Sequence, residues 1–586
     1  MILKYLKPRE WAMMAVCVLL IAAQVYLELE IPGYMSSITA TIETALLDPT
    51  YDGMDAVMSD GVWMLVCAVG SMATSIVVAL FASYIAASLA RRVRELEFNR
   101  VETFSSAEMG RFSVSSLITR STNDITQVQN AVAMGLQVMV KAPIMAVWAI
   151  TKIAGKGWEW TATTAVAVVV VLAAVVMVML YVVPRFRRVQ GLTDNVNRVT
   201  RENLTGIRVV RAYNAEPYQE AKFDAANDEL TNTNLQANRA LAMMYPVISA
   251  VESILSLAIY WIGAILIDAA GAADRLVYFS DMVVFSSYAI QVVMSFIMLV
   301  AIFMILPRAT VAARRIEEVI DTEPTVRDGP GAAPPEAGTV EFLDVSFRYG
   351  GAPEDVIRDM SFTAGSGETV AFIGPTGCGK STMMELIVRF LDATGGQVLV
   401  DGTDVRDYEL SDLRGRIGYV PQKAFMFRGT VDSNVRYGDR SEGVTEDQVR
   451  KAVEIAQAKD FVESKEGGYS APVSQGGANL SGGQKQRLSI ARAVCRNPEI
   501  YIFDDSFSAL DYRTDRTLRA ALRKETAGAT TLIVAQRIGT IMDADKIVVV
   551  DDGRIVGIGT HEELLRTCDT YLDIARSQLS EKELGL

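Results

Sequence analysis

Six long apolar stretches dominate the first half of the chain. They cover residues 11–30, 62–87, 131–153, 162–183, 240–267 and 282–306. Each comes close to or exceeds the roughly 20 residues that a helix needs to cross about 30 Å of hydrocarbon. We therefore predict a membrane α-helical domain with six transmembrane helices within residues 1–322.

The polar segments between these stretches predict long extensions and a second domain. Residues 91–129 and 185–238 carry apolar residues at helical spacing among charges, as in transmembrane helices that continue into the cytoplasm. Residues 323–338 are rich in Pro, Gly and Ala, which predicts a linker. Residues 339–586 alternate short β-rich runs with helical patterns, which predicts an α/β domain with its own core.

Basic residues gather after the second, fourth and sixth apolar stretches. Arg91, Arg185 and Arg308 each begin such a cluster. Because cytoplasmic ends of transmembrane helices carry an excess of Lys and Arg, we expect both termini and the α/β domain in the cytoplasm. The first stretch lacks a small-residue cleavage site and is expected to be a retained anchor. We expect an integral protein of a bacterial plasma membrane.

Composition and charge mainly exclude certain classes of partner and metal site. The chain has 586 residues, is 50% hydrophobic and carries a net charge of −13. Nucleic-acid phosphates require clustered Lys and Arg, so we expect no nucleic-acid partner. The five cysteines lack zinc-site spacing, and the single histidine, His561, excludes a His-rich metal site. We expect His561 on a surface helix rather than in a catalytic role.

The strongest motif follows a strand-like run and precedes a helical pattern. It matches G-x-x-x-x-G-K-[ST], the phosphate-binding loop of nucleotide-binding proteins. Its residues are Gly374, Pro375, Thr376, Gly377, Cys378, Gly379, Lys380 and Ser381, with Thr382 next in the chain. In such a loop backbone N–H groups surround the phosphates, Lys380 balances their charge, and the Ser381 hydroxyl reaches Mg²⁺.

Two further segments complete the nucleotide chemistry. An apolar run over residues 500–504 ends in Asp504, which is expected to hold the Mg²⁺ shell. The other segment, here called the signature, consists of Leu480, Ser481, Gly482, Gly483 and Gln484. Its two glycines precede a helical pattern and offer a second phosphate-facing surface. If the two loops lie on different faces, one nucleotide cannot be enclosed by both loops of one chain.

With these motifs the whole chain resembles a half-transporter of the ABC exporter type, six membrane helices fused to one nucleotide-binding domain. The resemblance implies that ATP is the nucleotide, that Tyr349 stacks on adenine and that Gln422 is the Q-loop glutamine and a further Mg²⁺ ligand. The D-loop resembles Ser508, Ala509, Leu510 and Asp511. Residues 104–124 and 202–223 resemble the loops that carry coupling helices. The resemblance also implies that two chains pair head to tail, with each ATP between one chain's phosphate-binding loop and the other's signature.

Two positions depart from the family's pattern. Asp505 stands where the family has a glutamate after the Mg²⁺ aspartate, and Gln536 stands where it has the switch histidine. A carboxylate that is one methylene shorter lies roughly 1.5 Å farther from the water it should polarise, and displacements near 1 Å can cost about a hundredfold in rate. Gln536 donates a hydrogen bond but carries no charge. We therefore expect strong ATP binding, slow hydrolysis and a different half-transporter as partner; neutral drift in a still-active site is the alternative.

Two ionisable residues within predicted spans bear on the cargo. Lys141 lies in the third span and Glu252 in the fifth. Such residues are costly in a membrane and usually face a cavity or a partner. Both are candidates for the substrate path, and an interfacial position and a structural pair between them are the open alternatives.

Together these patterns predict one subunit of an ATP-driven exporter. Its cargo would be small amphipathic or lipophilic compounds of the multidrug type, taken from the cytoplasm or from membrane lipid. A lipid floppase, an exporter-fold importer and a non-pumping regulatory subunit that only binds ATP remain as alternatives.

Overall fold

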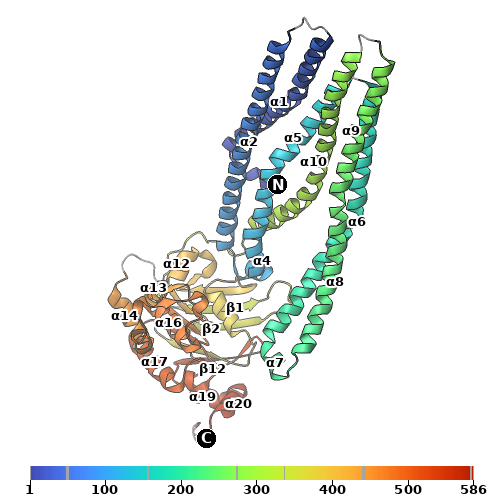
Figure 1. The fold of residues 1–586 in the computed structure, drawn as a ribbon. Coiled ribbons are helices and arrows are strands. Elements are labelled where there is room, and N and C mark those ends of the chain that lie inside the picture. Colours follow the sequence, from blue (N-terminus) through green and yellow to red (C-terminus); the bar gives the residue numbers. More distant parts are fainter. Residues whose placement is uncertain are drawn as a thin grey trace. The chain divides into compact units, whose positions relative to one another are not determined.

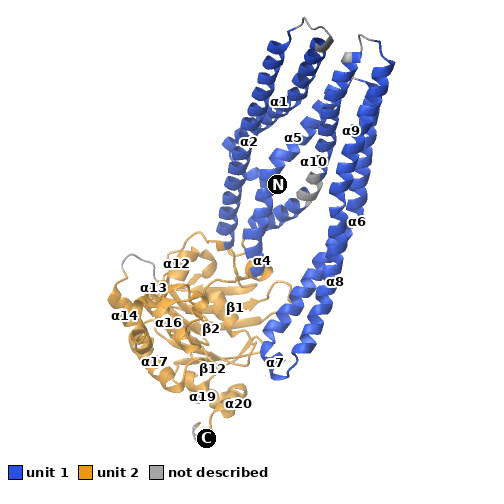
Figure 2. Ribbon diagram, viewed as in Figure 1, with its two compact units in different colours: residues 1–101, 115–322 blue, residues 102–114, 323–586 orange. Residues whose placement is uncertain are grey.

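The computed structural model describes residues 2–47, 52–154, 157–271, 275–335, 337–438, 444–580 and 584. The chain divides into two compact units (Figure 2). The first comprises residues 1–101 and 115–322, and the second comprises residues 102–114 and 323–586. A short segment from the first half of the chain therefore belongs to the second unit.

The first unit is built from helices (Figure 1). In chain order they are η1 (Ile2–Tyr5), α1 (Pro8–Leu47), α2 (Met54–Glu102), α4 (Val114–Thr119), the π-helix η2 (Arg120–Asp124), α5 (Ile125–Ile153), α6 (Trp158–Thr205), α7 (Ile207–Ala212), α8 (Glu216–Ala242), α9 (Met244–Ala269) and α10 (Arg275–Asp321). Among the described residues, 6 helical stretches are long and apolar enough to cross a membrane. The predicted six-helix membrane domain is thus confirmed, and its helices continue well beyond the apolar spans.

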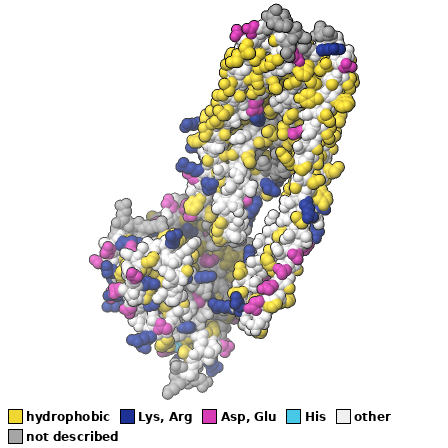
Figure 3. All heavy atoms as spheres, in the orientation of Figure 1, with side chains coloured by type: hydrophobic (Ala, Val, Ile, Leu, Met, Phe, Trp, Pro, Cys, Tyr) yellow, Lys and Arg dark blue, Asp and Glu magenta, His cyan; other side chains and the backbone are white. Residues whose placement is uncertain are grey.

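Apolar side chains of these helices point both outward and inward. Figure 3 shows hydrophobic side chains gathered over the upper part of the helices in that view. The lower end, where α7 and α8 lie in Figure 1, is mostly polar and charged. Leu180, for example, is 75% exposed, as suits a side chain in contact with lipid. Inside the bundle, the buried rings of Trp160 and Phe285 lie 5.6 Å apart, and the Trp160 indole donates to the Ile259 carbonyl at 3.2 Å. The Tyr288 hydroxyl likewise donates to the Leu29 carbonyl at 2.7 Å.

The second unit is an α/β domain. Its strands are β1 (Val340–Phe347), β2 (Ile357–Ala364), β3 (Thr369–Ile373), β4 (Gly395–Val400), β5 (Thr403–Asp404), β6 (Ile417–Val420), β7 (Gly429–Thr430), β8 (Pro472–Val473), β9 (Ile500–Asp504), β10 (Thr530–Val534), β11 (Lys546–Asp551) and β12 (Arg554–Gly559). Its helices are α3 (Ser106–Arg111), α11 (Lys380–Ile387), η3 (Val405–Asp407), α12 (Leu410–Gly415), α13 (Val431–Arg436), α14 (Glu446–Ile455), α15 (Lys459–Glu463), η4 (Gly468–Ser470), η5 (Gln475–Gly477), α16 (Gly482–Cys495), α17 (Tyr512–Glu525), α18 (Ile538–Ile541), α19 (His561–Thr567) and α20 (Asp569–Gln578).

The strands form a large sheet and two smaller ones. The large sheet has the order β12-β11-β3-β10-β9-β6, and only β12 pairs antiparallel within it. An antiparallel sheet has the order β2-β1-β4-β5, and β7 pairs with β8. Side chains of β3 alternate between two cores: Val370 and Phe372 join residues of the antiparallel sheet, whereas Ala371 and Ile373 join residues of α14, α16 and α17. Both faces of the large sheet are therefore buried, as expected of parallel strands.

Candidate nucleotide-binding site

The parallel strands bring the predicted nucleotide residues to one edge of the large sheet. β3, β10, β9 and β6 are neighbours that run in the same direction. Lys380, Gln536, Asp504 and Gln422 each lie at or soon after the carboxyl end of one of these strands. Ligands of open α/β sheets bind at this edge.

The loop between β3 and α11 has a backbone that only glycine fits at two positions. A Cβ on Gly374 would overlap the Val550 carbonyl oxygen. Gly379 has φ +101° and a Cβ there would lie 3.0 Å from the Val356 carbonyl oxygen. The loop then passes directly into α11, so its N–H groups and the helix N-terminus face the same region, which suits an anion.

Lys380 and Ser381 begin α11 and hold polar contacts suited to a phosphate and a cation. The Lys380 ammonium donates to the carbonyls of Gly374 and Pro375, both at 2.8 Å. The Ser381 hydroxyl donates to Oδ1 of Asp504 at 2.9 Å. Burial raises the pKa of Asp504, and the charge of Asp505 raises it further.

A hydroxyl beside a buried carboxylate fits Mg²⁺, which in nucleotide sites uses one or two protein oxygens together with the phosphates. Ser381 and Asp504 would hold the ion, which supplies neutralisation of phosphate charge. Among the described residues no group of three or more His, Cys, Asp and Glu side chains could hold a metal by itself.

Asp505 occupies the centre of the predicted catalytic positions. Its Oδ2 accepts a hydrogen bond from the Gln536 amide at 2.8 Å and another from the Gln422 amide at 3.1 Å. Its backbone lies in the left-handed region with φ 45°, and its N–H donates to the Val534 carbonyl at 2.9 Å. Residues after β6, β9 and β10 therefore converge on one carboxylate oxygen. Gln422, predicted as an Mg²⁺ ligand, has its amide nitrogen on Asp505, and its role toward the metal stays a prediction.

Tyr349 lies beside the first turn of α11. Its ring is 40% exposed and stands edge-on to Phe347, and its hydroxyl lies 3.1 Å from the Thr382 hydroxyl. Glu385, which the sequence analysis did not single out, belongs to this region: burial and the charge of Asp504 raise its pKa. The i, i+4 spacing from Ser381 is the signal that could have identified it.

The signature forms the start of a helix. Ser481 caps α16 through a reciprocal pair in which its hydroxyl accepts from the Gln484 N–H at 3.3 Å and its N–H donates to the Gln484 side chain at 3.0 Å. A Cβ on Gly482 would meet nothing within 4 Å, so the space in front of this helix start is open. A Cβ on Gly483 would lie 3.3 Å from the Ala509 carbonyl, which places the predicted D-loop beside the signature. Asp511 in turn caps α17, accepting from the Thr514 N–H at 3.0 Å.

The alternative pairing of the two membrane charges is wrong. The Lys141 ammonium donates to Glu28 at 2.9 Å, not to Glu252. Gln24 and Ser71 donate to the same Glu28 oxygen, at 2.8 and 3.1 Å. Glu28 was not identified from the sequence because it falls at the edge of the predicted first span, whereas α1 continues to Leu47. Glu252 has one buried carboxylate oxygen without a hydrogen-bond partner, and its place on a substrate path stays a prediction.

Two other expectations concern helices. His561 is the first residue of α19, and its Nδ1 lies 2.7 Å from the hydroxyl of the buried Tyr571. It is half-buried rather than fully exposed, and it takes part in packing at the end of the chain. The two segments expected to carry coupling helices contain the short helices α3 and α7.

Comparisons with known proteins relate both halves of the chain to one family. A family model described as "ABC transporter transmembrane region" matches residues 14–296, and one described as "ABC transporter" matches residues 357–508. An uncharacterized ABC transporter ATP-binding protein of Mycobacterium tuberculosis is 41% identical over 89% of this chain and 88% of that protein. An ATP-dependent lipid A-core flippase of Aromatoleum aromaticum is 30% identical over 86% of this chain and 82% of that protein.

The fold has a counterpart among solved structures. A bacterial Atm1-family ABC exporter with ATP bound superposes with a TM-score of 0.76 at 23% identity, covering 98% of each chain. Both halves of the chain are thus accounted for by one architecture. The chain belongs to the ABC transporter family, as an exporter half-transporter that fuses its transmembrane region to its ATP-binding domain.

Proposed function

We propose that this chain is the impaired-site subunit of a heterodimeric ATP-driven exporter for amphipathic or lipophilic compounds. The observation that carries the proposal is the pair of amide hydrogen bonds to Asp505 Oδ2. A general base needs a free lone pair within reach of the attacking water. Here two amides donate to Oδ2 of the shortened carboxylate, so protein donors engage that oxygen, and neither amide carries the charge that a histidine could.

The remaining residues support ATP binding at this site. Gly374–Ser381 would enclose the phosphates, Asp504 and Ser381 with Gln422 would serve Mg²⁺, and Tyr349 would stack on adenine. The signature is intact, and the open space at Gly482 leaves room for a nucleotide held by another chain. A partner with its own catalytic glutamate and histidine would therefore form the competent site with its own phosphate-binding loop and this chain's signature.

The cycle converts ATP contacts into movement of helices. Closure of two nucleotide-binding domains around ATP would favour one arrangement of the membrane helices, and hydrolysis at the competent site would return them to the other. The basic clusters beginning at Arg91, Arg185 and Arg308 support a cytoplasmic position for the ATP-binding domain.

A lipid cargo is the second candidate. Some relatives carry the name ATP-dependent lipid A-core flippase, among them the protein of Aromatoleum aromaticum, which is 30% identical to this chain. Lipids and lipophilic drugs share an apolar body with a polar end, so one membrane-facing path suits either.

Transport and assembly can be tested together. The tagged chain, isolated from its native membrane in mild detergent, should bring a second, different half-transporter in equal amount. ATP-driven uptake into inverted vesicles is then measured with two probes, a lipophilic cationic dye and a fluorescent phospholipid, and right-side-out vesicles report import. Lys380→Ala should reduce uptake at least tenfold. Unchanged uptake in Lys380→Ala would show a regulatory subunit and contradict the proposal.

A further inference from the structure

The second unit receives the chain at three places. The chain passes between the units at residues 101–102, 114–115 and 322–323. The first two crossings flank α3 and lead to α2 and, through α4 and η2, to α5. The third follows α10 directly. Contacts that hold these three crossings together would therefore also link α2, α5 and α10 to the ATP-binding domain.

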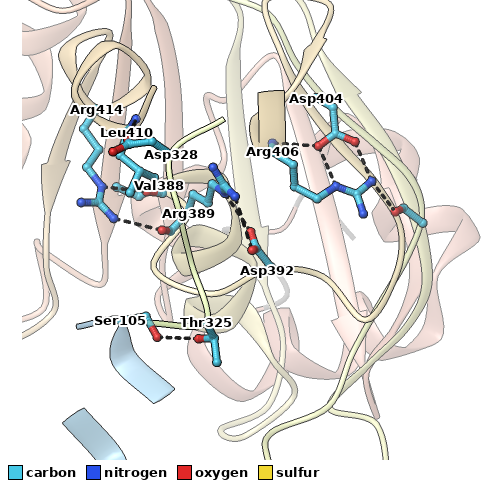
Figure 4. Close-up of polar contacts among 11 residues, drawn as sticks. Ser105, Thr325, Asp328, Val388, Arg389, Asp392, Asp404, Arg406, Leu410 and Arg414 are labelled. Carbon is cyan, nitrogen blue, oxygen red and sulfur yellow. Dashed lines mark hydrogen bonds and ion pairs between the residues drawn. The ribbon is translucent and has the colours of Figure 1, made fainter. Parts of the chain in front are cut away.

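One buried carboxylate joins α3 to the chain that follows α10. Glu108, in α3, is 5% exposed. Its Oε2 accepts from the Ser105 N–H at 2.8 Å and from the Ser105 hydroxyl at 2.6 Å, and its Oε1 accepts from the Thr325 N–H at 3.2 Å. Figure 4 shows the hydroxyls of Ser105 and Thr325 facing each other, 3.0 Å apart. Burial by itself would raise the pKa of Glu108, but the hydrogen bonds from Ser105 and Thr325 lower it, so the charged form is held.

The chain after Thr325 is fastened as well. We call residues 325–331 the strap. Asp328 accepts from the Leu410 N–H at the start of α12 at 2.8 Å, and Gly329 donates to the Tyr408 carbonyl at 2.8 Å. A Cβ on Gly329 would overlap the backbone of residues 406–407, which shows how closely the strap lies against this segment. The first half of the Pro-, Gly- and Ala-rich segment is thus bound to the domain.

α3 and α12, which hold the strap, also contact the residues at the end of α11, the helix that follows the phosphate-binding loop. α3 contacts the residues after α11 because the Ser106 N–H donates to the Phe390 carbonyl at 3.4 Å. Arg414 of α12, beside the strap, donates to the carbonyls of Val388 and Arg389 at 3.3 and 3.0 Å (Figure 4). α11 begins at Lys380 and Ser381, so one short helix runs from the nucleotide site to these contacts.

We propose that Glu108 is a positioning residue for the transport cycle. It holds α3 and the strap together as one unit, here called the joint, so that all three chain crossings move together when the end of α11 moves. The inference rests on the proposed function, since it assigns how ATP-driven movement is passed on. If Glu108 only capped α3, its bonds to Ser105 would suffice and the bond to Thr325 would have no consequence. The two roles therefore predict different results for variants of Ser105 and Glu108.

The test compares Glu108→Gln with two matched variants in the complete, lipid-reconstituted transporter. Ser105→Ala removes the cap hydroxyl together with its contact to the Thr325 hydroxyl, and it leaves the bond from the Thr325 N–H to Glu108. Glu323→Gln neutralises an exposed carboxylate two residues before Thr325. Cysteines introduced at the exposed positions Ser59 and Ala269 carry spin labels, since the five native cysteines are buried. Three quantities are measured: ATP turnover, the ATP-driven change in the distance between the labels, and hydrogen exchange of residues 325–331.

We expect Glu108→Gln to raise the rate of hydrogen exchange in the strap at least tenfold. The fraction of molecules whose distance between the labels changes with ATP should fall at least fivefold. ATP turnover should stay within twofold of the unchanged protein. Glu323→Gln should resemble the unchanged protein, and Ser105→Ala, which keeps the bond from the Thr325 N–H to Glu108, should raise strap exchange less than threefold and keep the ATP-driven distance change. The inference is overturned if Ser105→Ala and Glu108→Gln behave alike, or if strap exchange in Glu108→Gln is unchanged. If the unchanged protein neither hydrolyses ATP nor changes distance, the proposed function fails, while strap exchange still decides the role of Glu108.

Discussion

At the scale of single residues, Asp505 is a position where the chain departs from the residue expected in the family. Its Oδ2 accepts two amide hydrogen bonds, and its N–H and the following turn fix the backbone in the left-handed region. Each of these contacts orients the carboxylate toward protein donors. Under the proposed function we expect this side chain to be a poor general base, because one of its two oxygens is held by protein donors.

The pKa of the only histidine, His561, gives a prediction that one NMR resonance can test. Burial lowers the pKa of its imidazole, so the folded protein favours the neutral ring. Protonation then destabilises the fold: the contribution is complete above the ordinary value of about 6.5 and is lost as the pH falls below it. With one histidine in the chain, selective isotope labelling gives one NMR resonance, which should titrate below about 6.5. His561→Gln provides the assignment control, and a value at or above the ordinary one would contradict the packing described.

Sequence reasoning identified the residues of the site but not their contacts. Asp505 and Gln536 stood out because a motif fixed the residue types expected there. Their shared hydrogen bond, and the one from Gln422, depend on strands far apart in the chain lying side by side. Glu28 was missed for a related reason, since its partner Lys141 becomes visible only when α1 and α5 pack together.

At the scale of elements, the polar cluster around Glu28 joins α1, α2 and α5. The side chains of Lys141 and Glu28 are only 22% and 23% exposed, so removing one of them leaves a charge with little access to water and costs up to about 3 kcal/mol. Lys141→Met should therefore lower the apparent free energy of unfolding by about that amount. The double variant Glu28→Gln with Lys141→Met should recover most of the loss, as measured by unfolding titrations in one detergent. Strictly additive effects would show that the pair does not couple the helices.

The phosphate-binding loop gives a second element-level prediction. Gly374→Ala places a methyl group against the Val550 carbonyl, so the loop must shift. ATP affinity of the chain should fall at least tenfold, or about 1.4 kcal/mol. Gly482→Ala is the matched control, because its Cβ meets nothing within 4 Å. It should leave this chain's own ATP affinity unchanged; equal losses in both variants would contradict the geometry of the loop.

The sequence predicted the existence of elements better than their extent. Hydropathy located the six spans, but it does not show where a helix ends once it has left the membrane, and α1, α2, α6 and α10 run on for many residues. Composition likewise predicted a linker at residues 323–338. Its first part is held by hydrogen bonds to α3 and α12. Composition does not show this, because a Gly- and Pro-rich segment can either be a free linker or lie closely against a surface.

At the scale of the whole molecule, the chain combines a complete phosphate-binding loop, an intact signature and altered catalytic positions. Alone, two such chains would form two impaired sites. With a different partner, one competent site would remain, formed by this chain's signature and the partner's loop. Under the proposed function we expect the ATPase activity of the purified chain to be limited by Asp505 and Gln536 rather than by ATP binding.

The measurement that tests this claim most directly is Mg²⁺-dependent ATP turnover by the purified chain alone in lipid, beside the variant Asp505→Glu with Gln536→His. The account predicts that the unchanged chain binds ATP but hydrolyses it slowly, and that the double variant gains at least tenfold in turnover, about 1.4 kcal/mol in barrier. Brisk hydrolysis by the unchanged chain as a homodimer would contradict it and would establish Asp505 as a working catalytic residue.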